Sequence, residues 1–229
     1  MKKVLFLLMS MFLISCAHNP PTARTLNKYF KSTVQIIVTS QGHGHSEGKM
    51  IRWSGTGFSV ATDGSSSTIL TNKHVCGGDG SQRQFIVMDY SGKRYSARWV
   101  RSDALADLCI IKTDAIIESV VLAKKNPVRG THIVVVGAPL GLFPNFTDGF
   151  ISGYYPLDMV SDEYETHARV AMTSVAIYPG NSGSGAFNDD GKLVGIFFAG
   201  SSDAEHITFL VPVETINMFL DDSQDVFER

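Results

Sequence analysis

The sequence predicts an all-β fold of the barrel type. Short runs of β-branched and aromatic residues recur along the chain, and clusters of Gly, Ser, Asn and Asp separate them. Such punctuation is typical of antiparallel barrels, whereas βαβ units would alternate strands with long helical segments. The total of 229 residues is enough to bury a substantial core. The predicted strands are residues 34–38, 57–60, 85–88, 133–136 and 193–198.

Two helices are expected, one on each side of this strand-rich region. The first covers residues 25–31 and precedes the first strand. The second follows Pro212, because Val213, Ile216, Phe219 and Leu220 recur there at helical spacing.

The N-terminus resembles a bacterial lipoprotein signal peptide. Two lysines at positions 2 and 3 precede an apolar stretch of 11 residues, 4–14, which is too short to span a bilayer as a helix. The segment Leu13-Ile14-Ser15-Cys16 resembles a lipobox, in which the cysteine is acylated and becomes the first mature residue. The alternative is an ordinary signal peptide that happens to contain a cysteine.

This resemblance implies that residues 1–15 are removed and that Cys16 anchors the chain in the membrane of a bacterial cell envelope. Ala17 follows the cysteine where retention at the inner membrane would call for aspartate, so in a Gram-negative host we expect the outer membrane, facing the periplasm. Residues 16–27, with two adjacent prolines, are expected to form a tether.

Composition argues against several other classes of function. The formal net charge is −2, and no Lys/Arg run or aromatic-basic interleaving points to nucleic acid as a partner. Gly42-His43-Gly44-His45 offers two histidines in a glycine-rich loop without a third ligand, so we predict no metal and no cofactor.

One serine stands where a nucleophile would sit. In Pro179-Gly180-Asn181-Ser182-Gly183, glycines before and after the serine permit a tight turn whose N–H groups, from Gly180 and Ser182, converge on one spot. A serine hydroxyl needs a base and such a donor pair to attack a carbonyl group. The tetrapeptide alone would be only a turn signal, and Ser174 and Ser184 lack glycines on both sides in this arrangement.

A histidine and an acid complete the pattern. His74 follows a predicted strand, and Asp107 lies 33 residues later and 75 residues before Ser182. The order His, Asp, Ser is that of one class of catalytic triad. His74 would be the base, Asp107 its orienting carboxylate and Ser182 the nucleophile. Asp103 is the competing acid, and His74 could by itself be a structural histidine.

Four blocks in order resemble the trypsin-like serine peptidases of the HtrA (Deg) type. The resemblance covers roughly residues 28–218; after Ser182-Gly183, Ser184 stands where that family usually has glycine, and Cys109 stands where it commonly has alanine. The blocks are Gly55-Thr56-Gly57-Phe58 with Leu70-Thr71-Asn72-Lys73-His74-Val75, then Ala106-Asp107-Leu108-Cys109-Ile110-Ile111-Lys112, then Val136-Gly137-Ala138-Pro139-Leu140-Gly141 with Gly149-Phe150-Ile151-Ser152-Gly153, and finally Pro179-Gly180-Asn181-Ser182-Gly183.

The resemblance implies a chymotrypsin-like fold of two six-stranded antiparallel β-barrels with the active site in the cleft between them. We expect a peptidase domain over 28–220, with barrels at about 33–125 and 130–212, a tail at 221–229, and no PDZ domain. HtrA-type enzymes are commonly trimers, so a homo-oligomer is an expectation. The specificity pocket would be lined by Ala176, Ile177 and Phe198, which favours small or medium aliphatic side chains at the cut.

Two further expectations concern single residues. Trypsin-like zymogens use an aspartate at the position of Asn181 to bind a newly cut N-terminal amine; asparagine is uncharged, so we expect no activation by N-terminal cleavage. Cys76 and Cys109 each lie two residues past a candidate triad member. They either form a disulfide or pack as two buried thiols.

Three functions are compatible with this pattern. The first is a lipid-anchored serine endopeptidase of the cell envelope that acts on protein or peptide substrates. The second is an inactive relative that keeps the fold as a peptide-binding module, which a complete triad argues against. The third is a hydrolase of esters or other acyl groups that uses the same residues.

Overall fold

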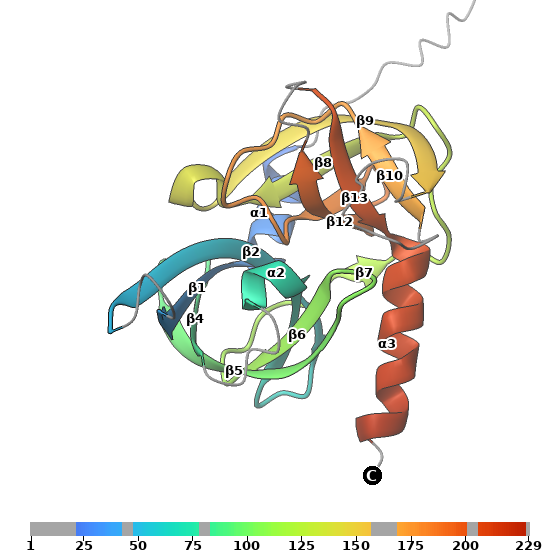
Figure 1. Cartoon of the computed structure of the whole chain (residues 1–229). Helices are drawn as coiled ribbons and strands as arrows, with labels where there is room; N and C mark the ends of the chain where they lie inside the picture. The colour runs from blue at the N-terminus through green and yellow to red at the C-terminus, as the bar shows by residue number, and fades with distance from the viewer. Residues whose placement is uncertain (1–21, 43–47, 78–82, 157–168, 201–205, 228–229) are drawn as a thin grey trace, which may run out of the picture.

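The computed structural model describes residues 22–42, 48–77, 83–156, 169–200 and 206–227 (Figure 1). The lipobox at Cys16, two histidines of the 42–45 run and the tail beyond 227 lie outside these ranges. Strands dominate the described part of the chain, so the prediction of an all-β fold is confirmed.

The first barrel is closed and six-stranded. Its strands follow one another around the barrel in the order β1-β2-β3-β6-β5-β4, and every pairing is antiparallel. Side chains alternate between core and solvent where one face is wet, as in β4, which buries Phe85 and Val87 and exposes Ile86. The strands are β1 (Thr33–Gln41), β2 (Met50–Thr62), β3 (Ser67–Asn72), β4 (Gln84–Met88), β5 (Arg94–Asp103) and β6 (Leu108–Thr113).

The second barrel is also six-stranded and antiparallel. Its order is β11-β8-β9-β10-β13-β12, and pairing of β11 with β12 closes it. The expected pair of six-stranded barrels is therefore confirmed. The strands are β8 (His132–Gly137), β9 (Asn145–Pro156), β10 (Arg169–Thr173), β11 (Gly185–Asn188), β12 (Lys192–Gly200) and β13 (Thr208–Pro212).

The connection between the barrels carries a short strand of its own. The short strand β7 (Val121–Leu122) pairs in parallel with β12 of the second barrel, at Lys192 and Leu193. The chain therefore leaves the first barrel after β6 and joins the second sheet before residue 125.

The expected helices are present at both ends of the barrels. Helix α1 (Ala23–Ser32) starts behind Thr22, whose hydroxyl accepts a hydrogen bond from the N–H of Thr25. Helix α3 (Val213–Phe227) follows the second barrel directly and runs down alongside the first (Figure 1). Two short pieces, α2 (Lys73–Cys76) and the 3₁₀ turn η2 (Pro139–Gly141), lie in loops near the candidate site.

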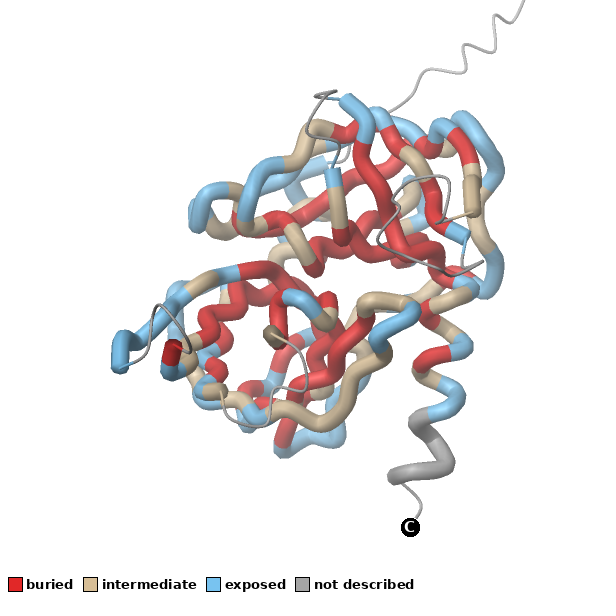
Figure 2. Tube along the Cα trace, viewed as in Figure 1, coloured by how far each residue is buried: buried red, intermediate tan, exposed pale blue. Residues whose placement is uncertain are grey.

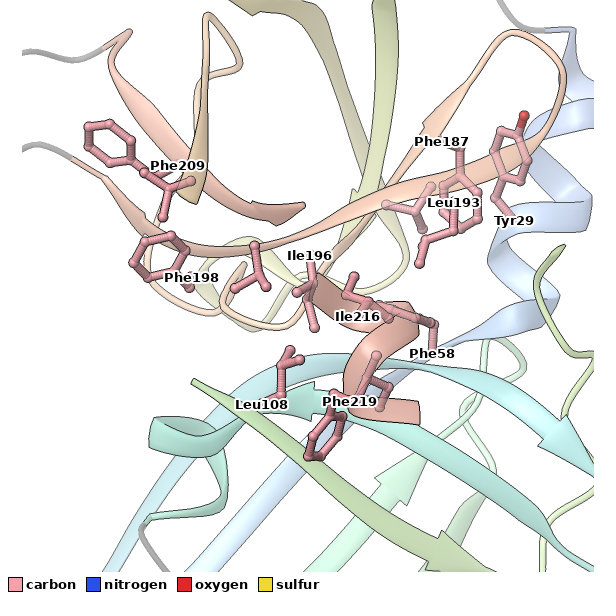
Figure 3. Close-up of a cluster of buried hydrophobic side chains, with 14 of the residues drawn as sticks. Tyr29, Phe58, Leu108, Phe187, Leu193, Ile196, Phe198, Phe209, Ile216 and Phe219 are labelled. Atoms are coloured by element: carbon pink, nitrogen blue, oxygen red, sulfur yellow. The ribbon is translucent and has the colours of Figure 1, made fainter. Parts of the chain in front are cut away.

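Three apolar clusters form the core, and buried chain runs through both barrels (Figure 2). One cluster fills each barrel, and the third lies between them. In Figure 3, Leu108 of β6 and Phe219 of α3 face Ile196 and Phe198 of β12. This shared cluster holds the two barrels together, so that loops from both meet at one place.

Candidate active site

His74 is placed by a single turn of helix at the end of β3. Asn72 is the residue before this helix, and Gly77, with a left-handed φ of 71°, ends it. The His74 side chain is 47% exposed, while its neighbours Val75 and Cys76 are buried in the first barrel. The imidazole is thus anchored by its backbone and accessible at its ring.

Asp107 occupies the turn between β5 and β6 and faces this imidazole. One carboxylate oxygen lies 2.7 Å from Nδ1 of His74, and the other accepts the backbone N–H of His74 at 3.0 Å. The carbonyl of Asp107 accepts hydrogen bonds from the N–H of Lys73 and the amide of Asn72, each at 3.0 Å. A neutral His74 whose Nδ1–H donates to this carboxylate presents Nε2 as the proton acceptor.

The competing groups are engaged elsewhere. Asp103 accepts the N–H groups of Leu105 and Ala106 and thereby closes the turn that leads to Asp107. His132, at the start of β8, has 4% of its side chain exposed, and its two ring nitrogens face the carboxylates of Asp148 and Asp189. That arrangement leaves neither nitrogen for a serine.

Ser182 lies in the turn before β11. Gly180 and Gly183 both have left-handed φ values, 100° and 87°, and a Cβ on Gly183 would lie 1.9 Å from the carbonyl oxygen of Thr56. Both positions therefore require glycine. The other candidate serines differ: Ser184 is fully buried, and the Ser174 hydroxyl accepts the N–H of Phe150.

The nucleophile turn rests on the first barrel beside His74. The N–H of Thr56 donates to the carbonyl of Ser182 at 2.8 Å. A Cβ on Gly55 would meet both the Val75 side chain, at 2.7 Å, and the Ser182 carbonyl oxygen, at 3.1 Å. Val75, the residue after His74, and Ser182 thus both lie against Gly55 of β2. Within the described chain, Nε2 of His74 and Oγ of Ser182 form no hydrogen bond, a separation that free active sites often show before substrate binds.

The turn leaves two N–H groups without partners. The N–H of Asn181 donates back to the carbonyl of Tyr178 at 3.0 Å, but those of Gly180 and Ser182 donate to no other described residue. Two such donors, two residues apart in the chain and next to a serine hydroxyl, are suited to binding an oxyanion.

The expected specificity residues pack in different parts of the core. Ile177 packs against the core of the second barrel and against the position of Gly200, where a Cβ would be 3.5 Å from it. Ala176 is half-buried beside it. Phe198 is 9% exposed and packs instead with Phe209 in the cluster between the barrels, at a ring separation of 6.5 Å.

Cys76 and Cys109 form a disulfide, which resolves the alternative that the sequence left open. Their Cα atoms are 6.6 Å apart, and both residues are fully buried. The bond joins α2 to β6, two residues beyond His74 and two beyond Asp107, and so fastens the segments that carry the imidazole and the carboxylate.

One residue that has a clear structural function at this site is not singled out by the sequence analysis. Thr56 connects the barrels through its backbone and its hydroxyl, which donates to Gly180 and accepts from Ala138. The signal was present in Gly55-Thr56-Gly57, because a lone hydroxyl between two glycines in a strand indicates close approach of other backbone.

No helix within the described ranges has the length and apolar character needed to cross a bilayer. Likewise, those residues contain no group of three or more His, Cys, Asp or Glu side chains arranged to hold a metal ion.

Comparisons with known proteins agree with this architecture. The family model described as "Trypsin-like peptidase domain" matches residues 55–196. The HtrA-type protease AlgW, solved with a tripeptide, superposes with a TM-score of 0.72 at 24% identity, over 88% of this chain and 62% of that one.

Three curated relatives carry serine protease names. The Do-like serine protease HtrA of Bacillus subtilis is 34% identical over 69% of this chain, and a DegP-like protein of Halomonas elongata, named as a periplasmic serine endoprotease, is 31% identical over 79%. The HtrA-like serine protease of Staphylococcus aureus is 27% identical over 86%.

The chain spans 36%, 36% and 28% of the lengths of these three relatives. The family match nevertheless covers more than half of the chain, from β2 through β12, and includes both the His74–Asp107 pair and Ser182. The chain therefore belongs to the trypsin-like peptidase family, within which its relatives are serine proteases of the HtrA type.

Proposed function

We propose that the protein is a serine endopeptidase that hydrolyses peptide bonds with a triad of His74, Asp107 and Ser182. The observation that carries this proposal is the combination of an oriented imidazole with two unpartnered N–H groups in the serine turn. Nδ1 of His74 lies 2.7 Å from the carboxylate of Asp107. Strand β2, which lies against Val75 next to His74, also binds the turn that carries Ser182. A binding module would need neither feature.

In the proposed mechanism, the hydroxyl of Ser182 attacks the scissile carbonyl carbon while Nε2 of His74 takes its proton. Asp107 stabilises the imidazolium that forms. The carbonyl oxygen becomes an oxyanion held by the N–H groups of Gly180 and Ser182. His74 then protonates the leaving amine, which yields an acyl-enzyme on Ser182, and water activated by His74 releases the acyl group.

The surroundings of the site support cleavage after small or medium aliphatic residues. Segments 173–180 and 197–200 contain no charged side chain that would attract lysine or arginine. Phe197 still exchanges hydrogen bonds with Gly183 and Ser184, each at 2.9 Å, whereas residues 198–200 of β12 pair within the described chain only with β13. The remaining edge is suited to an extended substrate backbone added as a further strand.

We further propose that Cys16 is acylated and holds the protein in the cell envelope, at the periplasmic face of the outer membrane. The lipobox supports the anchor, and the name of the Halomonas elongata relative supports the periplasm. Growth of a producing strain with an alkyne-tagged palmitate should label the chain, and a Cys16→Ala variant should lose both the label and its fractionation with membranes. A wild-type chain that stays unlabelled would contradict the anchor.

The activity itself is tested by treating the full chain with a fluorophosphonate and measuring its mass. We expect one adduct, mapping to Ser182 and missing from a Ser182→Ala variant. An unmodified chain with native circular dichroism would contradict the endopeptidase and favour a peptide-binding module.

Specificity needs a second experiment. In a library of fluorogenic peptides, those with Val or Ala before the cut should give the highest kcat/KM. Preference for Lys or Arg at that position would show that the aliphatic pocket is assigned wrongly, while hydrolysis of esters without peptides would favour the acyl hydrolase.

A further inference from the structure

Thr56 lies fully buried where β2 of the first barrel contacts the nucleophile turn of the second. Its N–H donates to the carbonyl of Ser182 at 2.8 Å, and its hydroxyl donates to the carbonyl of Gly180, also at 2.8 Å. The same hydroxyl oxygen accepts the N–H of Ala138 at 3.0 Å. One residue of the first barrel thus makes three hydrogen bonds to segments of the second.

These bonds belong to a larger pattern in which four consecutive carbonyls of the turn are all occupied. Thr56 binds those of Gly180 and Ser182. The N–H of Ser184 donates to the carbonyl of Asn181 at 2.8 Å, and that of Leu140 to the carbonyl of Pro179 at 2.7 Å.

Peptide planarity converts these contacts into a direction for the oxyanion donors. In a trans peptide the C=O and the following N–H point in opposite directions. Because the carbonyl of Pro179 faces Leu140, the N–H of Gly180 points away from Leu140. The carbonyl of Asn181 in the same way determines where the N–H of Ser182 points.

Thr56 controls this arrangement directly and through a neighbour. It fixes the two peptide groups that alternate with the donor-bearing ones, and through Ala138 it holds the segment from which Leu140 reaches Pro179. We propose that Thr56 is a positioning residue that keeps the N–H groups of Gly180 and Ser182 aimed at the oxyanion. This role rests on the proposed function and concerns the same reaction.

The position of Thr56 is itself tightly determined. Its carbonyl accepts the hydroxyl of Thr71 at 2.7 Å. A Cβ on Gly57 would lie 2.7 Å from the Ile36 side chain, and one on Gly55 2.7 Å from that of Val75, so a side chain at either position would force its neighbours to shift. Serine could supply the same donor and acceptor, whereas valine has the shape of threonine without the hydroxyl.

The test compares Thr56→Val with Thr56→Ser in the full chain. The quantity measured is the rate at which a fluorophosphonate labels Ser182. Without the hydroxyl, the carbonyl of Gly180 and the N–H of Ala138 lose their partner. We expect Thr56→Val to label roughly 10- to 100-fold more slowly, less than the ~10²–10³-fold loss typical when an oxyanion donor is removed outright. Thr56→Ser should label within about threefold of wild type, since it keeps the hydroxyl.

A matched control separates this role from the general loss of a buried hydroxyl. Thr113 of β6 is 2% exposed, donates to the carbonyl of Ser96 at 2.8 Å and accepts the N–H of Ala115 at 3.4 Å. Thr113→Val removes an equivalent pair of bonds away from the turn, so it should lower the stability but not the labelling rate. Thr56→Ala serves as a second hydroxyl-free variant if Thr56→Val unfolds.

Substrate affinity provides the second readout. The oxyanion exists only after the serine has attacked. Misaligned N–H donors should therefore slow the reaction without weakening substrate binding. In a Ser182→Ala background, Thr56→Val should bind fluorescein-labelled casein with an unchanged Kd. Labelling of Thr56→Val at the wild-type rate, equal slowing in Thr56→Ser, or a parallel loss of casein binding would each overturn the role of Thr56. A wild-type chain that is itself unlabelled would instead contradict the proposed function.

Discussion

At the scale of single residues, the most constrained group in the site is Asp107. It is one of two non-glycine residues with positive φ in the described chain, at 51°. Four hydrogen bonds hold it there, from the side chain and N–H of His74, the N–H of Lys73 and the amide of Asn72. A left-handed conformation is costly for a residue with a Cβ and persists where its surroundings demand it.

This geometry leads to a first prediction for Asp107→Asn. An asparagine amide keeps the size of the side chain but favours the wrong tautomer of His74, so the rate of peptide hydrolysis should fall roughly 10⁴-fold with little change in the fold. The measurement is kcat on a fluorogenic peptide, with circular dichroism as the control. Activity within tenfold of wild type would mean that Asp107 does not orient the base.

The residues of the site differ in how far the sequence could reveal them. His74, Asp107 and Ser182 could be proposed from the sequence because residue type and order reflect the chemistry of a triad. Thr56 has an ordinary side chain whose importance comes from contacts 124 and 82 residues away along the chain, at Gly180 and Ala138. The disulfide was undecided because separation between Cα atoms is a tertiary property.

At the scale of elements, the disulfide fastens a helix that could not form alone. Helix α2 has four residues, which is too short to be stable by its own hydrogen bonds. Cys76 at its end is joined to Cys109 of β6 across 33 residues of chain. The disulfide therefore restrains the short helix that carries the imidazole of His74.

The second prediction concerns the Cys76→Ala/Cys109→Ala double variant. Release of a cross-link of this length should lower the free energy of unfolding by about 3–4 kcal/mol. Urea denaturation followed by tryptophan fluorescence measures the loss. Dithiothreitol should shift the wild-type midpoint in the same direction and leave the double variant unmoved; equal responses of the two would show that the bond contributes nothing.

Tyr154 of β9 is expected to make the stability of the fold depend on pH, through its contacts with the segment between the barrels and with α3. The hydroxyl of Tyr154 donates to the carbonyl of Pro127 at 2.7 Å, and Glu214 lies nearby in the first turn of α3. Burial, and to a lesser extent the charge of Glu214, raises the pKa of Tyr154 to about 12 from its ordinary value of 10.0.

A third prediction follows from this raised pKa. The folded chain holds the phenol proton more tightly than the unfolded chain, so this contribution to stability is fully present below pH 10 and declines as the pH rises towards 12. Urea midpoints between pH 9 and about pH 11 should therefore fall less steeply in Tyr154→Phe than in wild type. Parallel slopes would exclude Tyr154 as the titrating group.

At the scale of the whole molecule, the sequence predicted two barrels but not how they are joined. The strand runs and glycine clusters reflect local structure, which explains why the strands and both terminal helices were found. The pairing of β7 with β12 joins residues about 70 positions apart in two residue pairs, and two residues carry too little pattern to predict it. The packing of α3 against the first barrel likewise depends on tertiary contacts.

Through this packing, helix α3 contacts both barrels. Ile216 and Phe219 are buried in the cluster that also contains Leu108, the residue after Asp107 (Figure 3). The guanidinium of Arg101, on β5, lies 3.8 Å from the centre of the Phe219 ring and donates to its carbonyl. Burial lowers the pKa of Arg101, although Asp222 and Asp103 oppose the shift. The helix that follows the second barrel therefore packs against the first barrel through the shared cluster.

The last prediction tests whether the barrels unfold as one body. Phe219→Ala should lower stability by about 3–5 kcal/mol, as expected for a large buried aromatic side chain. Both tryptophans, Trp53 and Trp99, lie in the first barrel, so their fluorescence reports on the barrel that α3 touches but does not belong to.

If the shared cluster couples the barrels, the fluorescence midpoint and the hydrogen-exchange protection of β8 and β13 should fall together in Phe219→Ala. Met218→Ala changes the neighbouring residue of the same helix, whose side chain is 62% exposed, and should shift stability by less than about 0.5 kcal/mol. Loss of protection in the second barrel with an unmoved fluorescence transition would show that the barrels unfold separately. The alignment of His74 with Ser182 would then depend on the contacts of Thr56 rather than on the core between the barrels.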